Sequence, residues 1–300
     1  MVSIITINYN GWKDTCELIM SLKQFESYPY EVIVVDNASK EDEANFILTA
    51  NPEVTVIRSF RNLGFAGGNN LGYTYAKGKY IFFLNNDTVI KAPILEALVN
   101  KLNDPIVGGV SPMLRCYYSP YDVQYYGYQK MSQITLRHAT PPYDATCPQK
   151  YLVDREVEVM HGAAMMLRRD VIERVGLMSE VYFLYFEEFD WSYCILECGY
   201  KIWYEPKALV FHKEGTRIGG ITPMRKYYLV RGRFLFARRN LCGLNKILSC
   251  LYLLTVVIIQ SLVECFIRGN WKMVKAMFTG MLSGFFSSKN GTNKDKKYDS

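Results

Sequence analysis

The stretch KYIFFLNNDTV, residues 79–89, decides the predicted fold. Its apolar run, residues 80–84, stands between a basic residue and a polar segment. An apolar run of this length bounded by turn-forming residues predicts a strand buried on both faces. Such strands are typical of parallel sheets that helices cover on both sides. Polar residues after such a strand face the crevice in which open α/β sheets bind ligands. The carboxylate of Asp87 would be a ligand for Mg²⁺ or Mn²⁺ there.

The first ninety residues alternate between strand and helix patterns. This alternation predicts right-handed βαβ units and a Rossmann-like, three-layer α/β fold with a mostly parallel central sheet. The predicted strands are residues 2–8, 31–35, 54–57 and 79–84. The predicted helices are residues 12–24, residues 41–49 capped by Asn37 or Ser39, and a helix opened by the glycine-rich segment 62–70 that ends near residue 77.

The pattern is less regular after residue 90. Residues 116–154 are rich in tyrosine and proline and predict a long hairpin and loop, which in a compact domain is often functional. Strand character returns at residues 157–167. The other predicted elements are a helix at 93–102, a strand at 107–114, a short helix to about residue 175 capped by Asp170, a helix at 187–198, and two short strands at 200–204 and 208–211.

The last quarter of the chain is basic and apolar. From Arg225 onward fourteen Lys/Arg accompany three Asp/Glu, against 21 and 26 before it. Residues 247–263 carry no charge, but their length is at the short limit for a membrane span and polar residues gather on one side. Residues 271–286 repeat this pattern with Lys272 and Lys275 on the polar face. We therefore expect amphipathic helices lying in a membrane interface. A helical hairpin packed on the body and a dimer interface are the alternatives.

Composition narrows the functional class and the location. The apolar start of the chain lacks the pattern of a secretory signal, and the eight scattered cysteines lack zinc-site spacing. We therefore expect free thiols in the cytoplasm. The body is near neutral and has no basic, aromatic-interleaved stripe for nucleic acid. The basic tail suits an anionic membrane surface. We therefore expect a peripheral protein on the cytoplasmic face of the cell membrane. The sequence does not decide whether the protein forms a homodimer.

Three predicted strand ends carry polar side chains at one edge of the sheet. They are the segments 8–10 (NYN), 36–37 (DN) and 85–87 (NND). The glycines of segment 62–70 let the backbone approach a ligand closely, and the helix start after it favours an anion. This set indicates a nucleotide site in which Asp36 accepts from a base or a ribose hydroxyl, although neither a Walker loop nor G-x-G-x-x-G is present.

Seven stretches resemble, in the same order, the inverting family 2 glycosyltransferases, and particularly their rhamnosyltransferase-like branch. They are SIITINYNGWKDT (3–15), VIVVDNASKED (32–42), RNLGFAGGNNLGY (61–73), YIFFLNNDTVI (80–90), HGAAMMLRRDVIERVGLMSE (161–180), YFEEFDWSYCILECGYKIWY (185–204) and ALVFH (208–212). The resemblance implies a glycosyltransferase A-type fold, a nucleoside-diphosphate sugar donor, with dTDP-rhamnose favoured by the branch, and a divalent metal, Mg²⁺ or Mn²⁺.

The resemblance also assigns donor-binding and metal-binding residues. Tyr9 and Asp36 match positions that hold the base and ribose. Asp87 matches the last acid of the family's D-x-D metal signature, although Asn85 stands where the first Asp is commonest. His212 matches a histidine that completes the metal shell. The full set of candidate nucleotide-sugar ligands is Asn8, Tyr9, Asn10, Asp36, Asn37, Arg61, Asn62, Gly64, Asn69, Asn85 and Asn86.

Residues 187–190, EEFD, stand where the family carries its catalytic base. The candidate catalytic residues are Glu188, Glu187 and Asp190, with Glu188 aligned to the usual aspartate. In an in-line displacement Glu188 would take the proton of the acceptor hydroxyl. The neighbouring carboxylate of Glu187 would raise its pKa. Acidic residues in a first helical turn are also favoured by the helix dipole alone, so a purely structural role is the alternative.

The residue patterns and the resemblance together predict the domains and the acceptor. Residues 1–225 form the catalytic domain, with a nucleotide-sugar half at about 1–115 and an acceptor half at about 116–225. Residues 226–288 form the membrane-associated helical region, and residues 289–300 a disordered tail. The acceptor would be a glycan or a lipid-linked molecule of cell-surface polysaccharide synthesis. A nucleotidyltransferase and a non-catalytic sugar-nucleotide-binding protein at the membrane are the competing hypotheses.

Overall fold

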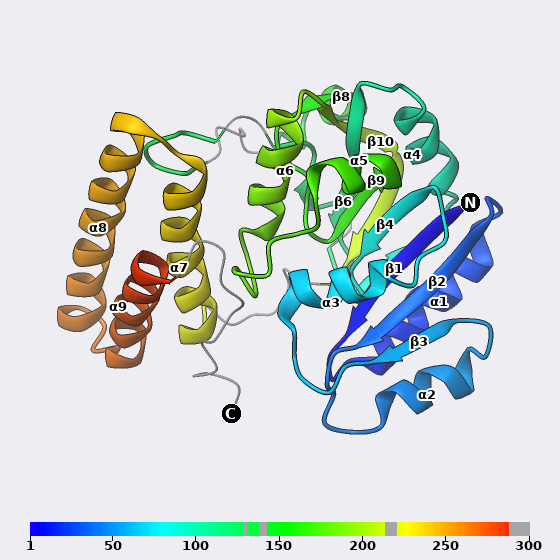
Figure 1. Cartoon of the computed structure of the whole chain (residues 1–300), viewed down its shortest axis with the longest axis horizontal. Helices are drawn as coiled ribbons and strands as arrows, with labels where there is room; N and C mark the ends of the chain where they lie inside the picture. The colour runs from blue at the N-terminus through cyan, green and yellow to red at the C-terminus, as the bar shows by residue number, and fades with distance from the viewer. Residues whose placement is uncertain (120, 129–130, 138–142, 214–220, 288–300) are drawn as a thin grey trace.

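The computed structural model describes residues 1–119, 121–128, 131–137, 143–213 and 221–287. A central sheet with helices on both faces lies beside a bundle of three helices (Figure 1). In the described residues the sheet has ten strands, with the order β3-β2-β1-β4-β9-β6-β10-β5, while β7 pairs with β6 and β8 with β10. The strands are β1 (Val2–Asn8), β2 (Tyr30–Asp36), β3 (Thr55–Arg58), β4 (Tyr80–Leu84), β5 (Thr88–Ile90), β6 (Val107–Cys116), β7 (Val123–Tyr125), β8 (Arg155–Val157), β9 (Ala164–Arg168) and β10 (Lys201–His212).

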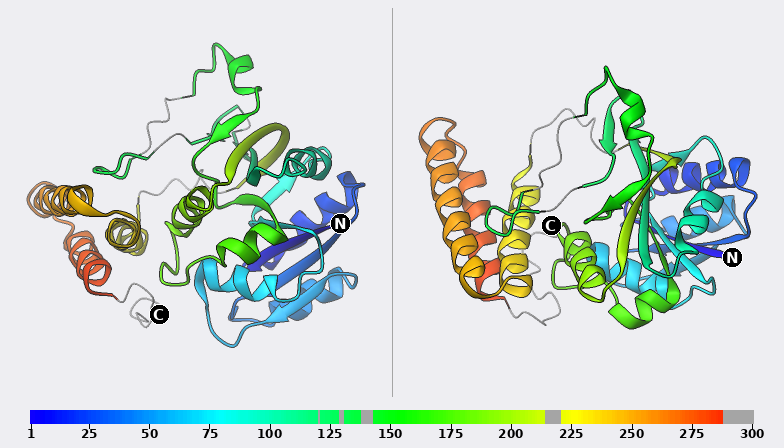
Figure 2. Two further views of the ribbon diagram at one scale, coloured as in Figure 1. Left: turned by 45° about the horizontal axis from the view of Figure 1, so that its top comes forward. Right: turned by 90° about the horizontal axis from the view of Figure 1, so that it is seen from above.

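Helices cover both faces of this sheet and give three layers, which confirms the predicted fold class. Helices α1 and α4 lie on one face, and α3, α5 and α6 lie on the other (Figure 2). The helices are α1 (Trp12–Phe25), α2 (Glu43–Ala50), α3 (Gly64–Tyr73), α4 (Leu95–Leu102), α5 (Arg169–Val175), α6 (Glu187–Glu197), α7 (Pro223–Asn240), α8 (Gly243–Phe266) and α9 (Trp271–Phe286). A short 3₁₀ helix (Pro148–Tyr151) lies in the long loop segment.

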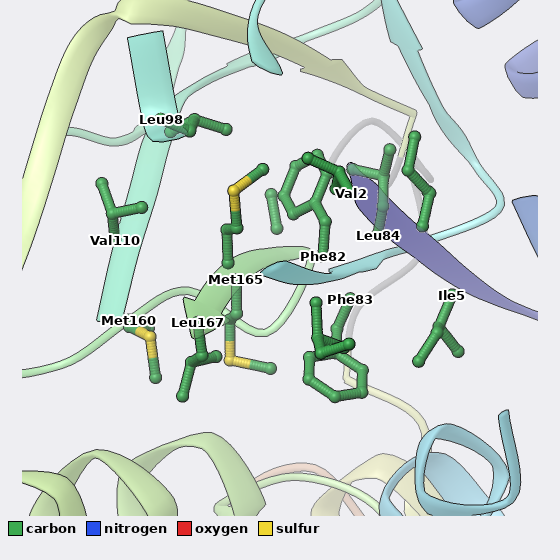
Figure 3. Packing of buried hydrophobic residues seen from close by; sticks show 14 of the residues in the cluster. Val2, Ile5, Phe82, Phe83, Leu84, Leu98, Val110, Met160, Met165 and Leu167 are labelled. Atoms are coloured by element: carbon green, nitrogen blue, oxygen red, sulfur yellow. The ribbon is translucent and has the colours of Figure 1, made fainter. Parts of the chain in front are cut away.

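Strand β4 is buried along its whole length at the centre of the sheet. Successive side chains of a strand point to opposite faces. Phe82 therefore packs towards Leu98 of α4, and Phe83 packs on the opposite face (Figure 3), where its ring meets Trp191 of α6 at 5.5 Å between centroids. Since both faces are covered, the strand reads as a continuous apolar run, as the sequence predicts.

Strands β3, β2, β1 and β4 are parallel neighbours, so their carboxyl ends meet at one edge. The register places Asn8, the last residue of β1, opposite Asp36, the last residue of β2. The other half of the sheet is mixed, because β9 runs antiparallel to both β4 and β6. After the turn that follows β4, strand β5 pairs antiparallel with β10 and sets Thr88 opposite His212. This pairing brings the far end of β10 to the predicted ligand edge.

Four local predictions from the sequence are wrong. The strand predicted at 157–167 is two strands, β8 and β9, with residues 158–163 between them. The two short strands at 200–204 and 208–211 are one strand, β10, with an irregularity between Glu205 and Leu209. Pro206 lies in this interval and lacks the N–H that a regular ladder needs. Helix α2 is capped by Asp42, whose side chain accepts from Asn45 N, rather than by Asn37 or Ser39. The cap position of α5 is Arg168; Asp170 lies inside the helix and accepts from the Nε atom of Arg168 at 3.0 Å.

The C-terminal region forms a bundle of α7, α8 and α9 next to α6 (Figure 1). Helix α7 packs closely on α9, and Gly284 permits this approach. A Cβ atom at Gly284 would lie only 2.5 Å from the carbonyl oxygen of Arg231. Helix α9 has the predicted bounds, and α8 extends past the predicted 247–263 at both ends. Within the described part of the chain, α8 is the one helix long and apolar enough to cross a membrane. The predicted tail, residues 289–300, lies outside the described residues.

Candidate active site

The ends of β1 and β2 are joined by a buried polar network. The amide nitrogen of Asn8 donates to Asp36 Oδ1 at 3.2 Å and to Glu43 Oε2 at 2.8 Å, and its oxygen accepts from Thr15 Oγ1 at 2.8 Å. Asp36 also accepts from the hydroxyl of Ser39 at 2.5 Å. Asn8 is fully buried, so its side chain positions the neighbouring strand ends. In this structure Asn8 therefore does not reach the crevice for which the sequence proposes it.

The amide of Asn37 shapes the glycine-rich segment at the start of α3. Its nitrogen donates to Asn62 Oδ1 and to the carbonyl of Gly64, both at 3.1 Å, and its oxygen accepts from Leu63 N at 2.9 Å. Gly64 has φ of 71°, and a Cβ atom there would lie 2.3 Å from the carbonyl oxygen of Phe183. Glycine is therefore required by both the backbone conformation and the close approach of the loop before α6.

A cavity of about 490 Å³ opens at this edge of the sheet. It brings together candidate donor-binding residues from three predicted strand ends and the glycine-rich segment. Residues that the sequence analysis did not single out also line it. The predicted lining residues are Tyr9, Asn37, Asn62, Gly64, Asn85, Asn86 and Asp87, and the additional ones include Lys40, Phe183, Leu184, Met224 and Tyr228.

Four other predicted donor residues do not line this cavity. Asp36, predicted to hold the base or ribose, is buried, and its carboxylate accepts from Asn8 and Ser39. Arg61 is exposed, and Asn69 is buried inside α3. Asn10 is exposed with φ of 53°, and its side-chain oxygen accepts from Lys40 N at 2.9 Å. That bond holds Lys40, whose side chain lines the cavity, beside the strand ends. Asn10 therefore positions a cation, whereas the sequence assigned it to direct contact with the donor.

Asp87 and His212 meet at the end of the cavity. Asp87 Oδ1 lies 3.1 Å from His212 Nε2, and Gln124 Oε1 lies 2.8 Å from His212 Nδ1. An amide oxygen can only accept, so Nδ1 carries a proton and Nε2 faces the carboxylate. Burial opposes ionisation of Asp87, but the hydrogen bond and charge of His212, aided by Lys213, outweigh it and lower the pKa of Asp87.

The Asp87–His212 pair fits a divalent cation by its chemistry. A carboxylate oxygen and a ring nitrogen that face each other at 3.1 Å are two acceptors whenever the ring is neutral, and a cation between them satisfies both. Carboxylate suits Mg²⁺ and Mn²⁺, and imidazole favours the transition metal. No third His, Cys, Asp or Glu joins them among the residues whose placement is given, which agrees with Asn85 in place of a second acid.

The first turn of α6 holds Glu187 and Glu188 in a dry setting. Burial raises the pKa of Glu188 to about 7, although backbone N–H groups at 186 and 188 oppose the change. Burial, followed by the nearby charge of Glu188, raises the pKa of Glu187 well above its ordinary value. One carboxyl oxygen of each is buried without a hydrogen-bond partner in the described chain. The loop leading to this turn has positive φ at Phe183, Tyr185 and Phe186, which is a strained arrangement typical of functional sites.

Glu187 and Glu188 do not line the cavity, but the loop at 161–162 lies near both Glu188 and His212. The carboxyl carbon of Glu188 lies 3.8 Å from where a Cβ atom on Gly162 would stand. The adjacent ring of His161 lies 6.3 Å from that of His212, between centroids. Burial, together with the charge of His212, lowers the pKa of His161 to about 3, so this ring is neutral. The loop containing His161 and Gly162 is therefore a neighbour of both the candidate base and the candidate cation site.

Asp190 has a structural role in place of the predicted catalytic one. It is buried, and its Oδ1 accepts from Tyr182 Oη at 2.8 Å, from Asn240 Nδ2 at 2.6 Å and from Arg239 Nε at 3.2 Å. These bonds tie α6 to the end of α7. Arg231 makes a second tie, because its guanidinium donates to the carbonyls of residues 181 and 182 at 2.7 and 3.1 Å. The bundle thus holds the loop that carries the base.

The sequence analysis missed several residues of the site. Gln124 comes from the irregular segment 116–154, where no periodicity marks it. Tyr128 lies in the tyrosine-rich part of the same segment, which the sequence indicates as functional. Burial, followed by the nearby charge of Glu188, raises the pKa of Tyr128 to about 12. Tyr128 therefore lies close to Glu188. Phe183 and Tyr228 stack at 5.3 Å between centroids along the cavity wall. The histidine–glycine pair at 161–162 was a further available signal, since polar residues interrupt an apolar strand there.

The Glycosyl transferase family 2 domain matches residues 3–176, more than half of the chain. The chain belongs to glycosyltransferase family 2. This membership confirms the resemblance. The matched residues run from β1 to α5 and include Asp87 and the strand-end residues of the cavity. The GT-A fold follows from both the family and the solved structures that share it.

Curated relatives include transferases of several sugars. The chain is 28% identical over 255 residues to dTDP-rhamnosyl transferase RfbF of Shigella flexneri, covering 79% of each chain. It is 27% identical over 209 residues to the low-salt glycan biosynthesis hexosyltransferase Agl10 of Haloferax volcanii, covering 64% of this chain and 60% of that protein's length. These identities support a sugar transferase related to rhamnosyl and hexosyl transferases.

Solved structures with the same fold confirm the architecture. GalNAc-T7 with UDP, GalNAc and Mn²⁺ has a TM-score of 0.62 at 19% identity, covering 80% of this chain and 50% of that one. The mannosyltransferase PcManGT from Pyrobaculum calidifontis, in complex with GDP-Man and Mn²⁺, has a TM-score of 0.58 at 18% identity, covering 95% and 87%. At such identities the likeness concerns the fold alone.

Proposed function

We propose that this family 2 glycosyltransferase moves a sugar, with inversion, from a nucleoside-diphosphate sugar to a hydroxyl of a glycan or lipid-linked acceptor of cell-surface polysaccharide. The observation that carries the proposal is a carboxyl group, Glu188, whose pKa of about 7 suits a base, beside a loop that also lies near the acid–histidine pair of the strand-end cavity. dTDP-rhamnose is the first donor to test, because the sequence resembles that branch and RfbF is named for this donor.

The cavity residues suit a nucleotide diphosphate. Tyr9 presents an aromatic face that is 45% exposed, against which a base can stack. Asp36 and Asn37 fix the strand end beneath it. Lys40 supplies a positive charge on the same cavity, where a diphosphate needs one. A divalent cation held by Asp87 and His212 would, when bound, supply the charge that neutralises the departing diphosphate.

Glu188 acts on the acceptor in this mechanism. Its ionised carboxylate takes the proton of the acceptor hydroxyl while the acceptor oxygen forms a bond to the anomeric carbon. The bond from that carbon to the phosphate oxygen breaks, and the diphosphate leaves with the electron pair. Because attack and departure occur on opposite sides, the anomeric configuration inverts. Glu187, protonated beside it, keeps the pair from carrying two charges.

Replacing Glu188 by Gln tests the mechanism. Turnover, measured as release of nucleoside diphosphate in the presence of acceptor, should fall about 10³-fold, which is within the range for a general base. Donor affinity, measured by calorimetry, should change little. Glu197→Gln on the exposed end of α6 is the matched control and should keep full turnover. Turnover in Glu188→Gln equal to that of the control would refute the assignment.

A non-catalytic sugar-nucleotide-binding protein is the second candidate. Asn85, which leaves one carboxylate in the metal signature, is the observation that favours it. A panel of nucleoside-diphosphate sugars with and without Mg²⁺ or Mn²⁺ separates the two, because a binding protein would bind donor and release no product. A nucleotidyltransferase is disfavoured by the family membership of residues 3–176.

We also propose that the enzyme sits on the cytoplasmic face of the membrane through its helical bundle. Many apolar side chains of α8 are exposed, among them Leu251, Ile258 and Ile259. The bundle also carries exposed lysines on α9, Lys272 and Lys275. Carbonate extraction of membranes tests this arrangement, because a peripheral helix is released at high pH and a spanning helix is retained.

A further inference from the structure

A second cavity, of about 580 Å³, lies between the catalytic body and the helical bundle. Its walls come from α6, α7 and α8 and from the segment 131–137. Most of these walls are apolar. The side chains that define them are Phe186 and Phe189 before and within α6, Val230 and Phe234 of α7, and Leu253 and Val257 of α8.

Three cations converge on this apolar space: Arg137, Lys226 and Arg233. No acidic residue lines it in the described part of the chain. Burial, followed by the charge of Arg137, lowers the pKa of Arg233, and burial, followed by Arg233, lowers that of Lys226. Arg137 is exposed, and Lys226 and Arg233 are half-buried. The three cations therefore repel one another at the cavity, and an incoming anion would relieve this repulsion.

Arg233 lacks a compensating acceptor. Its Nε atom is buried and has no hydrogen-bond partner among the residues described. Lys226 donates to Gln260 Oε1 at 2.7 Å, and Glu264, the acid that acts on Lys226, is paired with Arg268 at 2.8 Å. An unsatisfied buried guanidinium donor is costly, and its planar fork matches the oxygens of a phosphate.

The apolar walls indicate which kind of molecule the phosphate belongs to. A free sugar phosphate would leave the phenylalanine and leucine surfaces in contact with polar groups. A hydrocarbon chain would cover them, at a gain of about 25 cal/mol per Å² of apolar surface. The outer face of α8 continues the apolar surface away from the cavity, with Leu254, Ile258 and Leu262 exposed. A lipid chain leaving the cavity thus meets more apolar surface.

The cavity shares the first turn of α6 with Glu188, since Phe186 and Phe189 flank the two glutamates. We propose that it holds the phosphate and the first hydrocarbon units of a lipid-linked acceptor, with Arg137, Lys226 and Arg233 binding the phosphate. The assignment rests on the proposed function, in which Glu188 takes the acceptor proton, and it names the acceptor as a phosphate-bearing lipid rather than a free glycan.

Calorimetry with the full chain in neutral detergent tests this site. Dodecyl phosphate is the probe, and inorganic phosphate is the comparison without a tail. We expect one saturable site for dodecyl phosphate and far weaker binding of inorganic phosphate. Arg233→Gln should weaken dodecyl phosphate binding at least about 10-fold, as expected for loss of a charge-assisted hydrogen bond. Lys272→Gln, which removes one exposed charge from the same bundle, should change it less than about 2-fold.

Two further variants keep the test decisive. Arg233→Lys retains the charge and should recover part of the affinity. If Arg233→Gln lowers the melting temperature, Lys226→Gln at the same cavity replaces it with the same expectation. Equal effects of Arg233→Gln (or its replacement) and Lys272→Gln, or equal affinity for inorganic and dodecyl phosphate, would overturn the proposal.

Nucleotide binding is measured in parallel to separate the two claims. Arg233→Gln should bind dTDP as the wild type does, because the nucleotide cavity is distinct from this one. Failure of the wild type to bind any nucleoside diphosphate, with dodecyl phosphate still bound, would count against the proposed function instead.

Discussion

The replacement Glu188→Gln should stabilise the protein, and the structure gives the size of the effect. The carboxyl of Glu188 lies beside Glu187 and Tyr128 with a pKa of about 7, against 4.5 ordinarily. Between these values the folded chain holds a proton that the unfolded chain has lost, so stability falls as the pH rises from about 4.5 to 7. The whole cost at pH 8 is about 3 kcal/mol, because each tenfold change in proton affinity corresponds to about 1.4 kcal/mol.

Glutamine removes this titration while keeping the size of the side chain. Urea unfolding at pH 8 should therefore show Glu188→Gln more stable than wild type by up to about 3 kcal/mol, and by less than about 1 kcal/mol at pH 5. The control Glu197→Gln should change stability by less than about 0.5 kcal/mol at either pH. Equal stability of Glu188→Gln and wild type at both pH values would refute the claim that the base is held in a dry place.

The same pKa fixes the pH dependence of the reaction. Only the ionised carboxylate accepts a proton, so kcat/KM should fall about tenfold per pH unit below about pH 7 and level off above it. If Glu188→Gln both stabilises the protein and removes activity, the active site lowers the free energy of unfolding of the wild type.

Three further predictions concern the loop, the bundle and the membrane. Gly64→Ala should raise the KM for donor and lower the melting temperature, because φ is 71° and a backbone carbonyl oxygen lies 2.3 Å from the new Cβ; unchanged kinetics would contradict this role. Arg239→Leu leaves Asp190 buried without its charge partner and should cost about 3–5 kcal/mol in urea unfolding; a loss below about 1 kcal/mol would show that the pair is not needed. The double variant Leu251→Ser and Ile258→Ser should reduce sedimentation with anionic vesicles, and undiminished sedimentation would place the contact elsewhere.

Much of the fold follows from local patterns in the sequence. Residues 80–84 predict a central buried strand because apolar side chains on both faces leave no alternation, and β4 confirms it. The polar residues after β1, β2 and β4 predict a shared ligand edge because parallel strands end together. Strand β10 was harder to predict, because Pro206 interrupts its pattern. Glu205 before the interruption and Leu209 after it both pair with β6, so the strand continues.

The individual roles of polar residues could not be predicted from local sequence. Asn8 and Asp190 have the residue types of ligand-binding groups, but partners distant in sequence, Glu43 and Arg239, occupy them. Gln124 reaches His212 across 88 positions from a segment without periodicity. Whether a polar side chain faces a ligand or an internal partner depends on such long-range packing, which a strand or helix pattern does not encode.

In the proposed mechanism one bound donor lies between Asp87 and Glu188. A crystal structure of Glu188→Gln with an intact nucleoside-diphosphate sugar and Mn²⁺ tests it most directly. We expect the nucleobase at Tyr9, the metal between Asp87 and His212, and the sugar's anomeric carbon turned towards the side chain at position 188. A donor bound in another cavity, or a side chain at 188 facing away from the sugar, would contradict it.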